Sequence, residues 1–391
     1  MLHDYSLIVF SHLRWDFVYQ RPQHLLSHMA AKRRVIFIEE PVHDEAAPHW
    51  ELSRPTQNVL VCRPHTPIAE ETFSDEQMPV LSTMLRKLIQ SEHINGNAVV
   101  WLYTPMALPL ARMFEPLAVV YDCMDQLAAF RFAPPQLLDR EAELIEWADV
   151  VFTGGPSLYR SKKDRHPNVH CFASSVDAAH FSQARHIEEP KDQAPIPHPR
   201  FGYYGVIDER LDPELIAAIA DAHPEWQVVM VGPVVKIDPA TLPQRSNIHY
   251  MGQRTYDQLP AYLGGWDVCI MPFARNESTE YISPTKTLEY MAAELPIVST
   301  PITDVAEPYG HIVYLGRTQA AFVAACEAAL AAPESERQAR VAQMRSVLAH
   351  TSWDSTASSM ESLIDRAIEN KLARVPKVNP TAVQPVLRQA S

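Results

Sequence analysis

Residues 281–300 read YISPTKTLEYMAAELPIVST, a loop followed by an amphipathic helix and a short apolar strand. Ser283 suits the N-cap and Pro284 the first helical position, because the missing N–H of proline would have no partner there. Lys286 then falls in the first turn, where the positive end of the helix dipole disfavours a cation. Either its ammonium group swings into solvent at a small cost, or Lys286 and the N–H and hydroxyl groups of Thr285 converge on a bound phosphate.

The alternation of strands and helices extends outward from this stretch in both directions. Near-continuous Val and Ile runs separated by helices are typical of parallel sheets covered on both faces. A polar, proline-rich stretch interrupts the pattern, which then restarts, so we predict an α/β chain with two Rossmann-like parallel-sheet domains facing a cleft. The expected parts are a first domain at 1–182, a linker at 183–199, a second domain at 200–350, a helix returning to the first domain at 351–375, and a disordered tail at 376–391.

Composition narrows the class of protein. A chain of 391 residues exceeds the usual size of one hydrophobic core, and a formal net charge of -13 argues against nucleic acid as a partner. The five cysteines contain no CxxC pair, and no apolar run approaches the ~20 residues that cross a bilayer. We therefore expect a cytoplasmic protein. The basic run at 160–166 fits either a solvated face or the inner face of a membrane that carries a lipid-linked acceptor, where the protein would bind weakly.

Polar and glycine residues follow the predicted strands of the second half. Ligands of open parallel sheets bind at the carboxyl ends of the strands, so these residues are expected at one edge. A single glycine or charged residue at such a place is more simply explained as part of a turn or as a solvated charge. Here, however, several successive strand ends carry such residues. Glu289, three residues after Lys286, is either a surface ion-pair partner or a carboxylate for ribose hydroxyls. The strand-end candidates are Gly205, Arg210, Gly232, Gln253 and Arg254.

Three motifs carry a family resemblance. KTLEYMAAELPIVST at 286–300 resembles the helix-and-strand signature in the donor domain of GT-B glycosyltransferases, most closely the retaining family 4 (glycosyltransferase group 1). SSVDAAHF at 174–181 and GWDVCIMPF at 265–273 resemble further elements of that fold. The resemblance implies a nucleoside-diphosphate sugar as donor, with UDP the usual form, and no prosthetic group. It also implies that Glu289 binds the ribose, while the helix start holds the diphosphate through Ser283, Pro284, Thr285 and Lys286.

The sequence departs from that family at several positions. Tyr281 replaces the upstream glutamate of the usual pair, and residues 283–285 replace a glycine-rich turn. Glu294 stands where a glycine usually follows the helix. The arginine that usually follows the first glycine of the domain is absent, which leaves Arg210 as a displaced candidate. These departures indicate a divergent branch in which Lys286 takes over part of the diphosphate clamp.

The first half is expected to hold the acceptor and a catalytic base. Asp122 and Asp125 directly follow a strand, so either can deprotonate an acceptor hydroxyl or merely cap the next helix. An aromatic residue such as Trp15 can stack on a sugar or pack internally, and His24 reads more simply as a structural residue than as a base. The candidates on the acceptor side are Arg14, Trp15, Arg21, Gln23 and His24.

Lysine, arginine and a helix dipole can neutralise a departing diphosphate, and no Asp-x-Asp pair follows a strand, so we expect no metal. The leading hypothesis is a retaining, metal-independent glycosyltransferase that acts on a hydroxyl of a glycan or lipid-linked acceptor in polysaccharide or glycoconjugate synthesis. Lys286 and one of the two aspartates would be its catalytic groups. The alternatives are a sugar-nucleotide epimerase of similar build and a non-catalytic GT-B subunit that binds nucleotide or protein.

Overall fold

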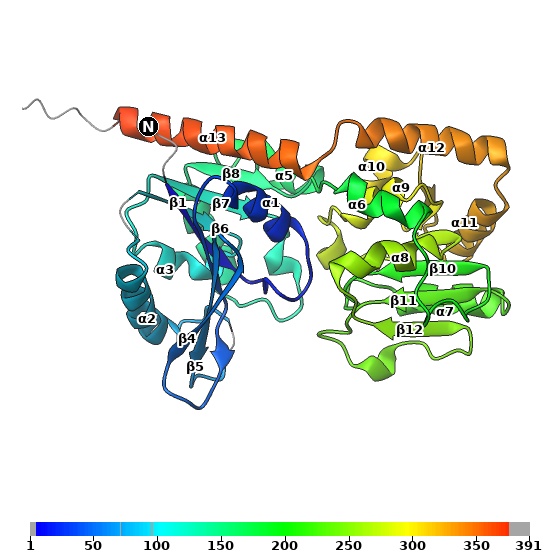
Figure 1. Cartoon of the computed structure of the whole chain (residues 1–391), viewed down its shortest axis with the longest axis horizontal. Helices are drawn as coiled ribbons and strands as arrows, with labels where there is room; N and C mark the ends of the chain where they lie inside the picture. Colours follow the sequence, from blue (N-terminus) through cyan, green and yellow to red (C-terminus); the bar gives the residue numbers. More distant parts are fainter. Residues whose placement is uncertain (1–4, 71, 95–96, 375–391) are drawn as a thin grey trace, which may run out of the picture.

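The chain folds around two parallel sheets that lie next to each other along its long axis (Figure 1). The coordinates are a computed structural model that describes residues 5–70, 72–94 and 97–374. Helices cover the faces of both sheets. The predicted α/β fold with two Rossmann-like domains is therefore confirmed, whereas the predicted tail at 376–391 lies outside the described residues.

The first sheet has the order β3-β5-β2-β1-β6-β7-β8-β9, and β4 joins it by antiparallel pairing with β5. Successive side chains of a strand enter two different cores, as Leu7 and Ile8 do in β1. This is why apolar residues run without alternation along these strands. The strands are β1 (Ser6–Ser11), β2 (Val35–Glu39), β3 (Val42–His43), β4 (His49–Thr56), β5 (Val59–Thr66), β6 (Ala98–Leu102), β7 (Ala118–Cys123), β8 (Val150–Thr153) and β9 (Val169–Cys171).

Helices from both ends of the chain cover the first sheet. α13 crosses back from the second domain and packs beside α1 over one face (Figure 1). Its buried apolar residues recur every three or four positions, at 353, 357, 360, 364 and 368, and Glu361 pairs with Lys32 and Arg33 at 2.8 and 2.9 Å. The predicted returning helix is therefore confirmed. The helices of this half are α1 (Arg21–Ala30), α2 (Met78–Ser91), α3 (Leu108–Ala111), α4 (Leu137–Trp147), α5 (Pro156–Lys162) and α13 (Trp353–Arg374).

The second sheet has the order β12-β11-β10-β13-β14-β15 and is parallel throughout the described residues. A single apolar cluster packs on it. Its strands are β10 (Arg200–Tyr204), β11 (Gln227–Val231), β12 (Ile248–Gly252), β13 (Val268–Met271), β14 (Ile297–Ser299) and β15 (Tyr314–Leu315). The α-helices between α5 and α13 are α6 (Ala178–Ser182), α7 (Pro213–Ala222), α8 (Leu259–Gly264), α9 (Lys286–Ala292), α10 (Thr303–Tyr309), α11 (Gln319–Ala331) and α12 (Glu334–Leu348).

The helix start that the sequence analysis singled out lies two residues later than predicted. α9 begins at Lys286 with Thr285 as its N-cap residue, and the Thr285 side chain makes no capping bond. Ser283 is therefore not the N-cap. Its carbonyl oxygen accepts a hydrogen bond of 2.6 Å from the Ser174 hydroxyl, which holds the loop before α9 against the chain that leaves the first domain.

The residue after α9 adopts the left-handed conformation that the usual glycine would favour. Glu294, which follows the C-cap residue Ala293, has a φ of 61°. Its carboxylate accepts from Arg185 at 2.6 Å and from Arg345 at 2.8 Å. Charge-assisted bonds to two other segments thus accompany a backbone conformation that costs most residues about 1 kcal/mol.

None of the helices within residues 5–70, 72–94 and 97–374 combines the length and the apolar character that crossing a bilayer requires.

Candidate functional site

A cavity of about 1140 Å³ lies between the two sheets. Loops that follow β1, β2 and β7 line it from the first domain, and loops that follow β10, β11 and β12, together with the start of α9, line it from the second. This is the edge where parallel sheets bind ligands. The predicted site residues that line the cavity are Trp15, His24, Asp125, Gly205, Arg210, Gly232, Gln253, Arg254, Thr285, Lys286 and Glu289.

Lys286 points from the start of α9 toward the turn after β10. A Cβ atom added to Gly205 would lie 2.7 Å from the Lys286 Nζ, and Gly205 has a φ of 130°. The ammonium lies 5.4 Å from the centroid of the Tyr203 ring. Burial lowers the pKa of Lys286 to about 8, and the nearby Glu289 carboxylate partly opposes this shift. The ammonium group is thus a poorly hydrated cation at a turn that only glycine can form so closely.

Glu289 lies one helical turn after Lys286 and is buried at the cavity wall. Its Oε2 accepts a hydrogen bond of 2.6 Å from the Tyr204 hydroxyl, which comes from the end of β10. Burial raises the pKa of Glu289, whereas the bond from Tyr204 and the charge of Lys286 lower it. The tyrosine therefore fixes the orientation of a carboxylate that faces the cavity beside a cation.

Arg210 is the displaced candidate for a phosphate clamp, and it is already paired. Its Nε and Nη2 donate to the Asp208 carboxylate at 3.0 and 2.7 Å. Asp125 of the first domain lies near this pair across the cavity. Burial raises the pKa of Asp125 to about 6, while Arg210 lowers it and Asp208 raises it. The pKa of Asp125 thus lies close to neutral pH, as that of a general base should.

Asp122 and Arg21 do not face the cavity. The Arg21 Nη2 and the Asp122 Oδ1 are 2.9 Å apart, and the exposed fractions of the two residues are 3% and 0%. Arg21 also donates to the carbonyl oxygen of Phe172 at 2.8 Å. Our expectation that Arg21 faces the acceptor and that Asp122 serves as a base is therefore corrected, because each satisfies the other inside the first domain.

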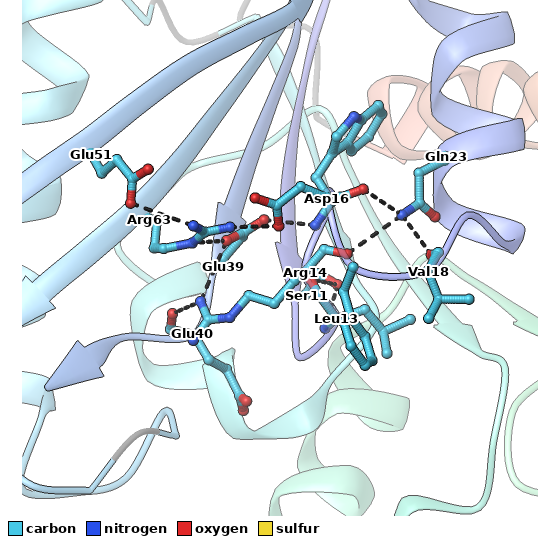
Figure 2. Close-up of polar contacts among 12 residues, drawn as sticks. Ser11, Leu13, Arg14, Asp16, Val18, Gln23, Glu39, Glu40, Glu51 and Arg63 are labelled. Carbon is cyan, nitrogen blue, oxygen red and sulfur yellow. Dashed lines mark hydrogen bonds and ion pairs between the residues drawn. The ribbon is translucent and has the colours of Figure 1, made fainter. Parts of the chain in front are cut away.

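Arg14 and Gln23 shape the loop after β1 rather than face a ligand (Figure 2). Arg14 donates to the carbonyl oxygens of Glu40 and Pro41, the latter at 3.1 Å. The Gln23 amide donates to the carbonyl oxygens of Trp15 and Val18 at 2.9 and 3.0 Å. Neither Arg14 nor Gln23 lines the cavity, so their predicted contact with the acceptor is replaced by a role in positioning this loop.

The same loop is tied to the sheet through a buried carboxylate (Figure 2). Glu39, at the end of β2, accepts from the Trp15 backbone N–H at 2.7 Å and from the Arg63 Nε at 2.6 Å. Arg63 also donates to Asp16 at 2.8 Å. These bonds fix the Trp15 backbone, and its side chain packs edge-on against Phe37 with ring centroids 5.1 Å apart.

The remaining predicted residues pack or pair with other parts of the protein. His24 stacks on Trp353 of α13 with ring centroids 4.8 Å apart, and burial lowers its pKa to about 4, so it is a neutral packing residue. The Gln253 amide donates to the carbonyl oxygen of Phe17 at 2.6 Å. Arg254 pairs with Asp192 at 2.7 Å. Ser283 and Pro284 do not line the cavity.

Two cavity residues escaped the sequence analysis, although both directly follow a strand. His12 follows β1, its pKa is lowered to about 4 by burial, and its Nδ1 has no hydrogen-bond partner among the described residues. Glu40 follows β2, and burial raises its pKa to about 8 against the lowering influence of Arg14 and Lys236. The strand-end rule that selected Asp125 would have found both if applied to every strand.

Residues 206–332, which carry most of the second-domain wall, match the family described as glycosyl transferases group 1. The predicted resemblance to this family is thus supported for that segment of the chain. A curated relative is the putative teichuronic acid biosynthesis glycosyltransferase TuaH of Bacillus subtilis (strain 168), which is 23% identical over 269 residues, or 64% of this chain and 68% of TuaH. The predicted family and enzyme class are thereby confirmed.

Solved glycosyltransferase structures share the GT-B fold of this chain. Sucrose-phosphate synthase from Thermosynechococcus elongatus superimposes with a TM-score of 0.72 at 16% identity, covering 94% of this chain and 100% of that one. A UDP-forming α,α-trehalose-phosphate synthase from Burkholderia xenovorans, in complex with glucose-6-phosphate, gives a TM-score of 0.68 at 13% identity, covering 92% and 99%. At such low identity these likenesses show the fold alone.

Tyr281, at the position of the missing upstream glutamate, helps to join the two domains. The Tyr281 side chain packs against the apolar core of the first domain that contains Leu102 and Tyr121. Tyr281 does not line the cavity. The carboxylates that do line the cavity are therefore supplied by other positions, among them Asp125 and Glu289.

The buried pair of Arg21 and Asp122 predicts a stability effect. Replacing Arg21 with Ala leaves an uncompensated buried carboxylate, so we expect the first domain to lose about 3–5 kcal/mol of unfolding free energy in urea titrations. The control is Arg160→Ala, which removes a half-exposed pair with Glu307 and should cost less than about 1 kcal/mol. Equal unfolding midpoints for Arg21→Ala and the wild type would contradict this structural assignment.

Proposed function

We propose that this enzyme moves a sugar from a UDP-sugar to a hydroxyl group of a glycan or lipid-linked acceptor, without a metal ion and with retention of configuration. The acceptor belongs to polysaccharide or glycoconjugate synthesis. The observation that carries the proposal is the approach of the Lys286 ammonium to Gly205, with Glu289 one turn further along α9. On one wall of the cavity, this arrangement supplies a cation, a turn whose backbone a ligand can approach closely, and a carboxylate that can accept hydrogen bonds from hydroxyl groups.

The donor lies on the second-domain wall in this proposal. Lys286 and the backbone of the Gly205 and Gly232 turns bind the diphosphate, because glycine lets a backbone N–H approach phosphate closely. Glu289, oriented by Tyr204, accepts hydrogen bonds from the ribose hydroxyls. UDP as the nucleotide follows the usual donor of the family, and the Burkholderia xenovorans relative in fold is described as UDP-forming.

The acceptor lies on the first-domain wall, where Asp125 can take its proton. The bond between the anomeric carbon and the diphosphate oxygen breaks while a bond to the acceptor oxygen forms. The acceptor proton passes to the Asp125 carboxylate, and Lys286 stabilises the negative charge that develops on the leaving diphosphate. Retention of configuration, which the resemblance to a retaining family implies, requires that the acceptor oxygen attack the anomeric carbon from the same face that the diphosphate leaves.

Fixed cations support a reaction that needs no metal ion. Lys286, Arg210 and Lys236 line the cavity. Within the described chain, the only group of three potential metal ligands contains residues that do not line the cavity. A positive charge for the leaving group is therefore available from the protein itself.

Turnover with a panel of UDP-, GDP-, ADP- and TDP-sugars tests the proposal. We expect a UDP-sugar and a suitable hydroxyl acceptor to release UDP, and we expect EDTA to leave the rate within about twofold, because Lys286 already neutralises the diphosphate. Coupled detection of free nucleoside diphosphate measures the rate. An epimerised sugar without UDP release would identify an epimerase, and activity lost in EDTA and restored by magnesium or manganese would overturn the metal-free step.

Lys286→Ala is expected to weaken UDP binding by about 1.5–3 kcal/mol, the size of a hydrogen bond to a charged group, and to leave uridine binding nearly unchanged. The reason is that only UDP carries the diphosphate. With a pKa of about 8 in the ligand-free protein, the ammonium loses its proton as pH rises, so wild-type affinity for UDP should fall above that pH. Calorimetry with both ligands measures the difference, and equal losses for UDP and uridine would refute the phosphate role.

Glu289→Gln is expected to weaken UDP binding by about 1–3 kcal/mol and to leave the fold intact, because glutamine keeps the volume but loses a charged acceptor. The comparison ligand is 2′,3′-dideoxy-UDP, which lacks both ribose hydroxyls and should bind wild type and variant alike. Tyr204→Phe serves as the matched control, since it removes the bond that orients Glu289 and leaves the charge in place. If Glu289→Gln weakens both nucleotides equally, the ribose assignment is wrong.

A further inference from the structure

Three side chains with metal-binding chemistry meet at the edge of the first sheet. Asp44, His49 and His65 each offer one ligand atom, and these atoms all lie within 4.8 Å of one another. Asp44 follows β3, while His49 begins β4 and His65 lies near the end of β5. None of the three lines the reaction cavity. The cluster therefore has no part in the proposed transfer reaction.

Backbone pairing holds the three residues in register. His49 and His65 are direct partners across the antiparallel β4–β5 ladder, and their rings stack with centroids 4.7 Å apart. The Asp44 backbone N–H donates to the carbonyl oxygen of Thr66 at 2.8 Å. Sites built on paired strands keep their geometry better than sites built on loops alone.

Hydrogen bonds at the far nitrogen of each ring orient the two histidines. The His49 Nδ1 lies 3.0 Å from the Ala47 carbonyl oxygen, which accepts only from a protonated nitrogen, so the Nε2 lone pair is left for a ligand. The His65 Nε2 lies 3.0 Å from a Glu51 carboxylate oxygen, which leaves the Nδ1 lone pair. Bonds of this kind accompany metal-bound histidines and set their tautomer.

The two remaining lone pairs face the same carboxylate oxygen. The Asp44 Oδ2 lies 3.4 Å from the His65 Nδ1 and 4.0 Å from the His49 Nε2. A tetrahedral Zn²⁺ with bonds of about 2.0–2.1 Å holds its ligand atoms about 3.3 Å apart. Because the three ligand atoms lie within 4.8 Å of one another, a contraction of at most about 1.5 Å brings this set to zinc geometry, and the side chains of His49 and Asp44, which are 48% and 35% exposed, leave room for it.

We propose that Asp44, His49 and His65 form a Zn²⁺ site, with the Asp44 Oδ2, the His49 Nε2 and the His65 Nδ1 as ligands and water as the fourth. Two imidazoles and one carboxylate suit zinc, whereas magnesium and calcium prefer oxygen ligands. The ion would clamp the β4–β5 hairpin to the loop after β3. The ion would have a structural role and would take no part in the proposed transfer reaction.

The site connects to the loop after β1 through a chain of charged groups. Glu51, which orients His65, also lies 3.4 Å from the Arg63 guanidinium (Figure 2). Arg63 in turn binds Glu39 and Asp16. An ion that fixes His65 would thus fix the Glu51 carboxylate that this arginine contacts.

Calorimetric titration of ZnCl₂ into the full chain, stripped with EDTA and then freed of the chelator, tests the proposal. We expect one Zn²⁺ per chain, with affinity reduced at least tenfold in His49→Ala and in His65→Ala. Glu51→Gln keeps the three ligands but weakens the orienting bond to His65, along with the contact to Arg63, and should cost up to about tenfold. Circular dichroism verifies that each variant folds, and Asp44→Asn, which keeps the side-chain volume, gives the same test with less risk to the fold.

His223→Ala is the matched control. His223 also contacts two carboxylates, Glu225 and Glu327, at 3.1 and 2.8 Å. It does not belong to the cluster of Asp44, His49 and His65. Its replacement should leave zinc affinity unchanged. With Co²⁺ as a probe, the wild type should show visible absorption of tetrahedral intensity that His65→Ala lacks. Wild-type zinc affinity in both His49→Ala and His65→Ala, or no binding by the wild type, would overturn the proposal.

Discussion

The close approach of two strand-end turns and one lysine is the constraint on which the donor wall depends. A Cβ atom at Gly232 would lie 1.9 Å from the carbonyl oxygen of Gly205, and one at Gly205 would lie 2.3 Å from the Cε of Lys286. Both glycines also have positive φ values, 148° and 130°. Only glycine satisfies these conditions together, so the ends of β10 and β11 can bring backbone groups and a cation to one point.

Contacts between the two domains hold the first-domain wall of the cavity opposite the second-domain wall. α13 returns to cover the first sheet, Tyr281 enters the core of the first domain, and Asp304 of α10 accepts from the Ser157 backbone N–H at the start of α5 at 3.0 Å. These contacts come from segments on either side of α9. The first-domain wall, with Asp125, is thereby held opposite Lys286 and Glu289 across one cavity.

The sequence predicts local features of this molecule well and distant pairings poorly. The parallel strands are visible because a strand buried on both faces needs an uninterrupted apolar run, as in β1 and β11. The β4 strand is not visible, since its residues are mostly exposed and include Pro55. Lys286 and Glu289 are found because their spacing is local. The pairing of Arg21 with Asp122 spans 101 positions, and no local pattern reveals that it removes both from the cavity.

The charged groups that line the cavity show why an anionic ligand suits it. Burial lowers the pKa of Lys286 to about 8 and of His12 to about 4, and it raises the pKa of Asp125 to about 6 and of Glu40 to about 8. Each shift disfavours the charged form, because the cavity replaces water without supplying a full set of counter-charges. A bound diphosphate would supply one for Lys286 and raise its pKa again. In the proposed reaction the diphosphate lies on the second-domain wall, so Asp125 would keep the raised pKa that suits a base for an acceptor hydroxyl.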